Sequence, residues 1–345
     1  MPPYPHATTL HFQSLVIDTH NDSIVSHIRR GNQSFDNPNR RGVGPDSLIA
    51  WLRGPLDGSV SATEVQLNFP KMIRGGVDCS FFHVDVSRAW KNHLAYALDG
   101  HGFFSWQLEE HKDVIQRVGN SSDIENAKKS GKLAAVLAIE NSDVCEGSLH
   151  VLEMLHHLGI RSMGLTHNLR SDVADGNYEE RSQSGLTHFG MEMVKTMNRL
   201  GMIIDISHIS RKGFYDVLEL STKPLIASHS CCRALCEHTR NLTDDQIRDM
   251  AHHGGTIGVT FVPDFVHPTQ PTLDRVIDHI DHIVQLVGPD FAALGSDFDG
   301  GGTVLEDAAV FQKITSKLLD RQYRDDDIKK ILGLNHLRVI RDNLG

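Results

Sequence analysis

Short apolar runs rich in β-branched and aromatic residues alternate along this chain with segments of helical periodicity. Each run is long enough for one strand, and each intervening segment is long enough for a helix and its connections. Strands that alternate with helices in this way are typical of parallel pairing through crossover helices. The pattern predicts eight strands, at residues 15–19, 77–85, 133–139, 160–166, 202–207, 224–228, 255–262 and 291–296.

The segments between the runs carry helix signals. Thr272 precedes apolar residues at helical spacing from Val276 to Val287, and Gly288 follows them, as a glycine at a helix C-terminus does. Thr243 and Gln246 have the spacing of a capping box. Eight strand–helix units favour a closed (β/α)8 barrel of the TIM-like type over an open sheet. We therefore expect an α/β fold with a single barrel domain over residues 1–345.

A long first connection between strand and helix, at about 23–76, interrupts this alternation. It is rich in Gly and Pro and irregular in pattern. In a parallel barrel such a connection lies on the C-terminal face, where it would suit a substrate loop. A simple surface insertion is the equal alternative.

Composition narrows the function classes. The chain has a formal net charge of −10 and no block of basic residues, which argues against nucleic acid as a partner. Five cysteines at irregular spacing do not suggest a disulfide framework. We see no signal peptide and no membrane segment, so a cytoplasmic location is the expectation.

Residues that bind metals or transfer protons follow six of the eight apolar runs. The first run ends in His-x-Asp, and side chains two positions apart in an extended chain point the same way. The C-terminal ends of the strands of a parallel barrel meet on one face, where active sites lie. These residues are therefore expected to share one site: His20, Asp22, Glu140, His167, His208, His229 and Asp297.

The ligand types indicate which metals this site would bind. Imidazole and carboxylate without thiolate suit zinc and also permit Mn, Fe, Co or Ni. There are too many ligands for one tetrahedral ion, so two ions that share a carboxylate use them better. His20 and Asp22 would bind one ion, His208 and His229 the other, and Glu140 would bridge them. Two such ions can hold a bridging hydroxide at neutral pH.

A competing metal site lies in the segment 229–238. Cys231, Cys232 and Cys236 stand there with His229 and His238, and this group could bind a structural zinc. The spacing lacks the usual paired-cysteine knuckle. Buried, unreactive thiols are the favoured interpretation.

Six motifs occur in an order that resembles the membrane (renal) dipeptidase family, peptidase family M19 of the amidohydrolase superfamily. The resemblance covers about residues 14–344, and Arg240-Asn241 and the segment 333–339 also match. The motifs are IDTHND at 17–22, AIE at 138–140, LTHN at 165–168, IDISH at 204–208, SHS at 228–230 and GSDFDG at 295–300.

The resemblance implies a zinc-dependent dipeptidase with two Zn²⁺ per chain, bound by the ligands given above. A metal-bridging hydroxide would cleave free dipeptides, both L,L and L,D. His167 would contact the scissile carbonyl oxygen, Arg240 would hold the terminal carboxylate of the substrate, and Asp297 would be the acid and base. Members of the family are often homodimers, so a homodimer is also compatible with the resemblance.

Two alternatives remain. One is another amidohydrolase reaction on the same binuclear site, such as hydrolysis of a lactam, a carbamate or a phosphotriester, or processing of a Cys-Gly conjugate. Most such enzymes use His-x-His on the first strand and often a carbamylated lysine, whereas this chain has His20-x-Asp22 and Glu140. The other alternative is a non-enzymatic zinc-binding protein, which is disfavoured because every expected ligand is present. The segments 23–76 and 260–264 match the family poorly, so the preferred substrate side chain stays open.

Overall fold

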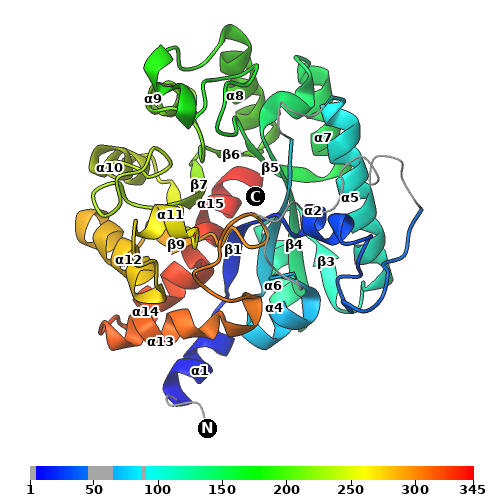
Figure 1. Cartoon of the computed structure of the whole chain (residues 1–345), viewed down its shortest axis with the longest axis vertical. Coiled ribbons are helices and arrows are strands. Elements are labelled where there is room, and N and C mark those ends of the chain that lie inside the picture. The colour runs from blue at the N-terminus through cyan, green and yellow to red at the C-terminus, as the bar shows by residue number, and fades with distance from the viewer. Residues whose placement is uncertain (1–4, 46–64, 87–90) are drawn as a thin grey trace.

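The computed structural model describes residues 5–45, 65–86 and 91–345. Within these residues nine parallel strands form one sheet, and eight of them are neighbours in the order β1-β2-β4-β5-β6-β7-β8-β9. Backbone hydrogen bonds join the two ends of this sheet, from Asp297 N to His20 O (3.0 Å) and from Asp22 N to Phe298 O (2.9 Å). The strands thus form a nearly closed barrel, and the predicted TIM-like architecture is confirmed (Figure 1).

Each of the eight apolar runs overlaps a strand, and β1, β4 and β7 extend one or two residues beyond the predicted run. The sequence pattern missed one strand, β3, which pairs only with β4 and lies off the barrel path. The bounds are β1 Ile17–Asn21, β2 Cys79–Asp85, β3 Ile115–Arg117, β4 Leu133–Glu140, β5 Ile160–Gly164, β6 Ile203–Asp205, β7 Ile226–Ser230, β8 Thr256–Val259 and β9 Ala292–Leu294.

Helices surround the strands (Figure 1). The capping box of Thr243 and Gln246 is present at the start of α10, and Thr272 caps α12. The helices are α1 Pro5–Gln13, α2 Ser23–Arg29, α4 Phe69–Gly75, α5 His93–Glu110, α6 Ser121–Lys129, α7 Leu149–Leu158, α8 His188–Leu200, α9 Arg211–Leu220, α10 Asp244–His252, α11 Pro263–Val266, α12 Leu273–Val287, α13 Gln312–Asp320, α14 Asp325–Lys329 and α15 Asn335–Leu344, with short helical turns η1 Ser142–Cys145, η2 Asn177–Ser182, η3 Ala308–Val310 and η4 Lys330–Leu334.

The first connection, predicted to be irregular over about 23–76, has a helix at each end, α2 and α4. Asn68 accepts a hydrogen bond from Lys71 N and so caps α4. The middle of the connection, residues 46–64, lies outside the described residues. The helices at its two ends are therefore what the structure adds to the sequence prediction.

Helix α15 packs against several strands at the end of the barrel opposite their C-terminal ends. The buried ring of His336 contacts Thr256 Oγ1 (3.1 Å) and Leu294 O (3.1 Å) with its two nitrogens. Asn335 Nδ2 donates to Ala292 O at 2.8 Å. These contacts fix α15 against β8 and β9 and leave the opposite, C-terminal ends of the strands to form a site.

Glycines make room for a close contact inside the barrel. Thr19 Oγ1 donates to Ser228 O at 2.8 Å, across the interior from β1 to β7. A Cβ atom at Gly295 would lie 1.7 Å from Ser228 O, and one at Gly258 would lie 2.3 Å from it. No side chain fits at either position without movement of the backbone, so the two glycines fix where the end of β7 lies.

Candidate metal-binding active site

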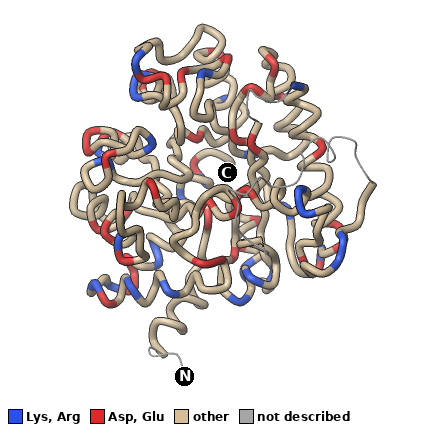
Figure 2. Tube along the Cα trace, viewed as in Figure 1, with Lys and Arg blue, Asp and Glu red and all other residues tan. Residues whose placement is uncertain are grey.

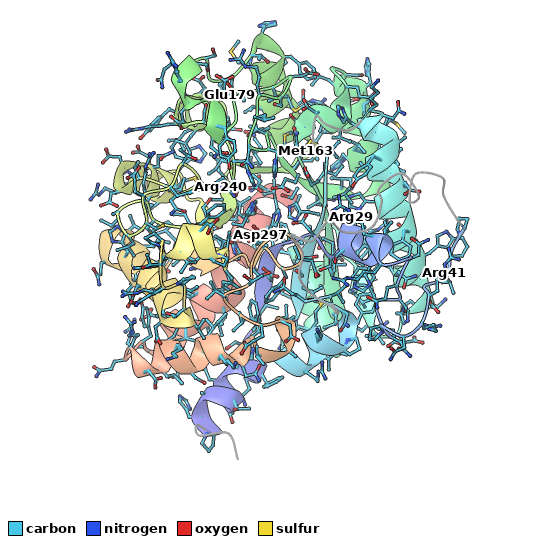
Figure 3. The ribbon with its side chains drawn as sticks, in the orientation of Figure 1. Arg29, Arg41, Met163, Glu179, Arg240 and Asp297 are labelled. Atoms are coloured by element: carbon cyan, nitrogen blue, oxygen red, sulfur yellow. The ribbon has the colours of Figure 1, made fainter. Side chains whose placement is uncertain are left out.

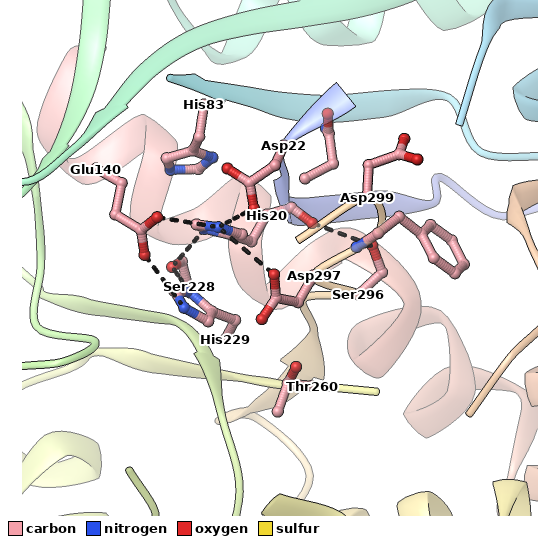
Figure 4. A network of polar contacts seen from close by, with 12 residues as sticks. His20, Asp22, His83, Glu140, Ser228, His229, Thr260, Ser296, Asp297 and Asp299 are labelled. Carbon is pink, nitrogen blue, oxygen red and sulfur yellow. Dashed lines mark hydrogen bonds and ion pairs between the residues drawn. The ribbon is translucent and has the colours of Figure 1, made fainter. Parts of the chain in front are cut away.

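Five side chains predicted as ligands converge at the C-terminal ends of the strands. Glu140, the last residue of β4, places Oε1 2.8 Å from His208 Nε2 and 3.5 Å from His229 Nε2. Its Oε2 atom lies 3.9 Å from His20 Nε2, and Asp22 Oδ2 lies 3.6 Å from the same nitrogen. The two oxygens of Glu140 therefore contact different groups, one the histidines after β6 and in β7 and the other His20 of β1, and Figure 4 draws the contacts of Glu140 with His20 and His229.

The hydrogen bonds of His208 and His229 determine which nitrogen of each ring carries the proton and which keeps a lone pair. His208 Nδ1 lies 2.8 Å from Asn168 Oδ1, which can only accept, so the proton is on Nδ1. Ser228 Oγ donates to Asp205 Oδ2 and therefore accepts from His229 Nδ1 at 2.7 Å. Both Nε2 atoms are left with a lone pair, yet they lie 2.8 Å apart.

Ser228 also holds the histidine of the first strand. Its Oγ atom lies 3.3 Å from His20 Nδ1, so one hydroxyl can accept from two imidazoles while it donates to Asp205. Asp205 in turn accepts from Ser207 N (2.9 Å) and Ser228 N (3.0 Å). A buried carboxylate on β6 thus orients ligands on β1 and β7 through a single serine, as the residues that support metal ligands commonly do.

The electrostatics of the cluster favour a cation. Burial alone would lower the pKa of His20, but Glu140, Asp22 and Asp297 outweigh burial and raise it to about 10. Burial lowers the pKa of His208 and of His229 well below the usual value, so both rings are neutral and present lone pairs. Three carboxylates beside neutral imidazoles stabilise positive charge, whether that of a proton or of a metal ion.

The residues present fit a metal centre. His20 Nε2, Asp22 Oδ1 and Glu140 Oε1 are buried without a hydrogen-bond partner among the described residues. Ligand atoms of His20, Glu140 and His229 lie within 4.8 Å of one another, as do those of Glu140, His167 and His208 and those of His20, Asp22 and Asp297. Buried lone pairs without donors are costly, and two cations that share Glu140 would satisfy them.

Asp297 lies beside the first ligand pair. Its Oδ1 atom is 4.0 Å from His20 Nε2, and burial raises the pKa of its carboxyl to about 6, although His20 opposes the shift. The backbone at Asp297 is left-handed, with φ 60°, and its carbonyl accepts from the amides of Gly301 and Gly302. This strained turn, held by two following glycines, points the carboxylate at the cluster.

The ligands open into a cavity of about 390 Å³, which His167 and Asp297 also line. The ring of His167 stacks on that of His208, with centroids 4.4 Å apart. Six further residues line the wall without a predicted role, although Asn168 and Asp299 lie within the quoted motifs: Ser26, Arg29, Asp85, Tyr96, Asn168 and Asp299. Asp85 carried a usable signal, because it directly ends the second apolar run.

Arg240 lies at the edge of this group. It is buried, its Nη2 donates to His229 O at 2.9 Å, and its guanidinium carbon is 5.3 Å from the centre of the Phe265 ring. Burial lowers its pKa, while Glu140 and Asp297 raise it. Arg240 lines a smaller neighbouring cavity of about 10 Å³, which shares His208 with the large one. Its Nε atom has no hydrogen-bond partner in the described part of the chain.

The cysteines do not form the alternative metal site. The thiols of Cys231, Cys232 and Cys236 lie against three different carbonyl oxygens, those of Thr260, His279 and Asp264. All five cysteines are buried, and burial raises the pKa of each thiol. They act as small apolar side chains of the core.

Two kinds of comparison relate the sequence to known proteins. The sequence model described as membrane dipeptidase (peptidase family M19) matches residues 5–344. Dipeptidase verJ of Clonostachys rogersoniana is 35% identical over 237 residues, which are 68% of this chain and 61% of that protein. Dipeptidase tcpJ of Claviceps purpurea is 34% identical over 243 residues, 68% of this chain and 57% of that protein. The match thus spans about six-tenths of the length of these relatives.

Solved structures share the fold. The dipeptidase AC, described as a metallo peptidase of family M19, has a TM-score of 0.82 at 23% identity, with 96% of this chain and 99% of that chain covered. A metallo peptidase from Rhodobacter sphaeroides has a TM-score of 0.81 at 22% identity, with the same coverage. In the described part of this chain, no helix is both long and apolar enough to cross a membrane.

Proposed function

Because this chain belongs to the membrane dipeptidase family, peptidase family M19, we propose that it is a metal-dependent dipeptidase that hydrolyses the peptide bond of free dipeptides. The observation that carries the proposal is the convergence of two unprotonated imidazole nitrogens, of His208 and His229, on one oxygen of Glu140. His20 and Asp22 approach the other side of the same carboxylate. This donor set suits two Zn²⁺ ions that share Glu140.

Two ions held there would act as Lewis acids toward a carbonyl oxygen and would acidify bound water. The chain's own residues carry the other tasks. His167 donates a hydrogen bond to the scissile carbonyl oxygen as negative charge develops on it. Asp297 accepts the proton of the attacking water and passes it to the leaving amine. Its burial beside His20 suits this exchange, because a carboxyl whose pKa lies near 6 can both accept and donate at neutral pH.

Arg240 would hold the terminal carboxylate of the dipeptide. A guanidinium presents a fork of N–H donors that matches a carboxylate, and the free Nε of Arg240 is consistent with such a role. An enzyme that binds the chain end in this way selects the peptide bond before the C-terminal residue over the internal bonds of a longer peptide.

The test is a panel of L-Xaa-L-Xaa and L-Xaa-D-Xaa dipeptides, offered to zinc-loaded and to metal-depleted protein. The panel includes L-Ala-D-Ala, because the Rhodobacter sphaeroides structure is liganded with a phosphinate mimic of that dipeptide. We expect turnover of dipeptides only by the metal-loaded protein. If the protein hydrolysed none of the dipeptides but did hydrolyse a lactam, a carbamate or a Cys-Gly conjugate, the dipeptidase proposal would be wrong. The related amidohydrolase reaction would then take its place.

A further inference from the structure

One carboxylate in the cavity has no part in the mechanism above. Asp85 is the last residue of β2 and lines the cavity. It is the register partner of Glu140 on the neighbouring strand β4. Register partners in a parallel sheet direct their side chains to the same face. Asp85 therefore faces the same space as the carboxylate proposed to bridge the metal ions.

Among the described residues one oxygen of the Asp85 carboxylate lacks a hydrogen-bond partner, as do one oxygen of Asp22 and one of Glu140, but Asp85 is not among the proposed metal ligands. Its Oδ1 atom is buried and has no hydrogen-bond partner in residues 5–45, 65–86 and 91–345. By contrast, Asp299 accepts from Ser23 Oγ (2.6 Å) and Gln66 N (2.8 Å). Asp22, Glu140 and Asp297 have the tasks already given. A buried, unpaired carboxylate oxygen is costly, and a cationic ligand would remove that cost.

The position of Asp85 identifies the end of the substrate that it would meet. His167, Asp22, His20 and Arg29 are all near enough to influence it electrostatically. Asp85 ends β2, next to β1 and α2 and within reach of His167 after β5, whereas Arg240 lies against His229 of β7. In Figure 3 Arg29 of α2 and Arg240 lie on opposite sides of Asp297. A substrate with its carboxylate at Arg240 and its scissile bond beside Glu140 would have its other end on the side of Asp85.

A free dipeptide has a carboxylate on one side of its scissile bond and an ammonium group on the other. We propose that Asp85 binds the free α-ammonium group of the N-terminal residue of the substrate. This inference rests on the proposed dipeptidase function and sharpens it. The site would recognise both ends of a dipeptide, Arg240 the carboxylate and Asp85 the amine. The substrate class is then the unblocked dipeptide, and acylated dipeptides are excluded.

The experiment compares the metal-loaded wild-type protein with Asp85→Asn on two substrates. One is L-Ala-D-Ala or the best dipeptide of the panel, and the other is its des-amino analogue, in which hydrogen replaces the ammonium group. Asp113→Asn, at an exposed carboxylate outside the cavity, is the matched control. Bound metal is measured for each protein, and the analogue is also tested as a competitive inhibitor, which reports binding without turnover.

We expect Asp85→Asn to lower kcat/KM for the free dipeptide by about 10- to 100-fold, mainly through KM, as loss of a charged partner does. Inhibition by the analogue should change by less than about 3-fold, because the analogue lacks the cation. Metal content should stay that of the wild type, and Asp113→Asn should behave as the wild type.

Four results would overturn the inference. Unchanged kcat/KM of Asp85→Asn on the dipeptide would contradict it while the dipeptidase function stands. Equal losses of dipeptide hydrolysis and analogue binding in the variant would also contradict the inference and leave the dipeptidase function standing. So would a loss of bound metal. In both cases Asp85 would support the site as a whole and not the ammonium group alone. If the wild-type protein hydrolysed no dipeptide, the proposed function itself would fail, and this inference with it.

Discussion

At the scale of single residues, the feature that most determines the chemistry is the tautomer of each ligand histidine. An imidazole binds a metal only through an unprotonated nitrogen, so the other nitrogen must find an acceptor. Asn168 is that acceptor for His208, and Ser228 serves both His229 and His20. Ser228 can accept from both rings because its hydroxyl proton is donated in a hydrogen bond to Asp205.

Replacement of Ser228 by Ala should therefore weaken both halves of the site. We expect about a 10- to 100-fold loss of zinc affinity, as is typical when a residue that orients metal ligands is removed. A competition titration against a chromophoric chelator measures the loss. Ser230→Ala is the matched control, because the hydroxyl of Ser230 is buried on the same strand and has no hydrogen-bond partner among the described residues. Equal affinities of the two variants would refute the role of Ser228.

Asp297→Asn tests the assignment of the acid and base. The amide keeps the shape of the side chain but cannot take up a proton, so kcat should fall by about 10²- to 10⁴-fold. Metal content, measured by atomic emission, should remain that of the wild type. Full activity would remove Asp297 from the proton transfer, and loss of metal would make it a ligand instead.

Among the elements, the strands of the barrel all end at its C-terminal face, so their last residues lie close together. Hydrophobic runs predicted the strands of the barrel because their interiors are apolar over several residues. The pattern missed β3, since three residues of which only Ile115 is fully buried give no recognisable run. Asp85 was missed because an acid after an apolar run is equally typical of an exposed turn, and only the register with Glu140 places it in the cavity.

The sequence predicted the convergence of the ligands because position at a strand end is a local property. It could not predict that Arg240 lies outside the wall of the large cavity, since that depends on the packing of Phe265 and the segment after β7. Nor could it predict the network of Asp205 and Ser228, which joins three strands through side-chain hydrogen bonds.

The close approach of β1, β7 and the segment after β9 leads to a prediction of stability. Gly295→Ala would place Cβ 1.7 Å from Ser228 O, and the required backbone shift should cost more than about 2 kcal/mol of unfolding free energy. Gly102→Ala is the control, because Gly102 lies within α5 and no atom of the described residues is within 4 Å of an added Cβ. It should be neutral or stabilise by up to about 1 kcal/mol. Urea unfolding measures both, and equal effects would contradict the packing described here.

At the scale of the whole molecule, charge and burial are unevenly distributed. In Figure 2 acidic residues gather near the centre of the barrel, and most basic residues lie toward its periphery. Several histidines remote from the site are buried and uncharged. Burial lowers the pKa of His11, His27 and His279 to about 4 and that of His336 to about 3. These rings serve as neutral hydrogen-bonding parts of the core.

The fold should therefore lose stability in mild acid. As the pH falls below about 6.5, these histidines become protonated in the unfolded chain, but in the folded chain they stay neutral until about pH 4. The free energy of unfolding therefore decreases over that interval. Each ring accounts for up to about 3 kcal/mol. The unfolding free energy of metal-free protein in urea, measured from pH 7.5 to 5, should decrease, because these histidines outweigh the buried carboxyls of Asp18 and Asp297, whose pKa is raised to about 6 and which act in the opposite sense as the pH falls.

His279→Gln provides the control for this pH dependence. His279 Nδ1 accepts from Cys232 N and its Nε2 contacts Val266 O, and an amide can make both kinds of bond without titrating. The variant should show a slope shallower by up to about 1.4 kcal/mol per pH unit. A slope identical to that of the wild type would exclude His279 as a cause.

The central claim is that two metal ions, shared through Glu140, make this barrel a dipeptidase. The most direct test is to add zinc stepwise to metal-depleted protein and to measure bound metal and the rate of dipeptide hydrolysis in the same samples. The account predicts that the rate reaches its maximum at two ions per chain. Full activity with no bound metal, or no hydrolysis of any dipeptide at two ions per chain, would contradict it.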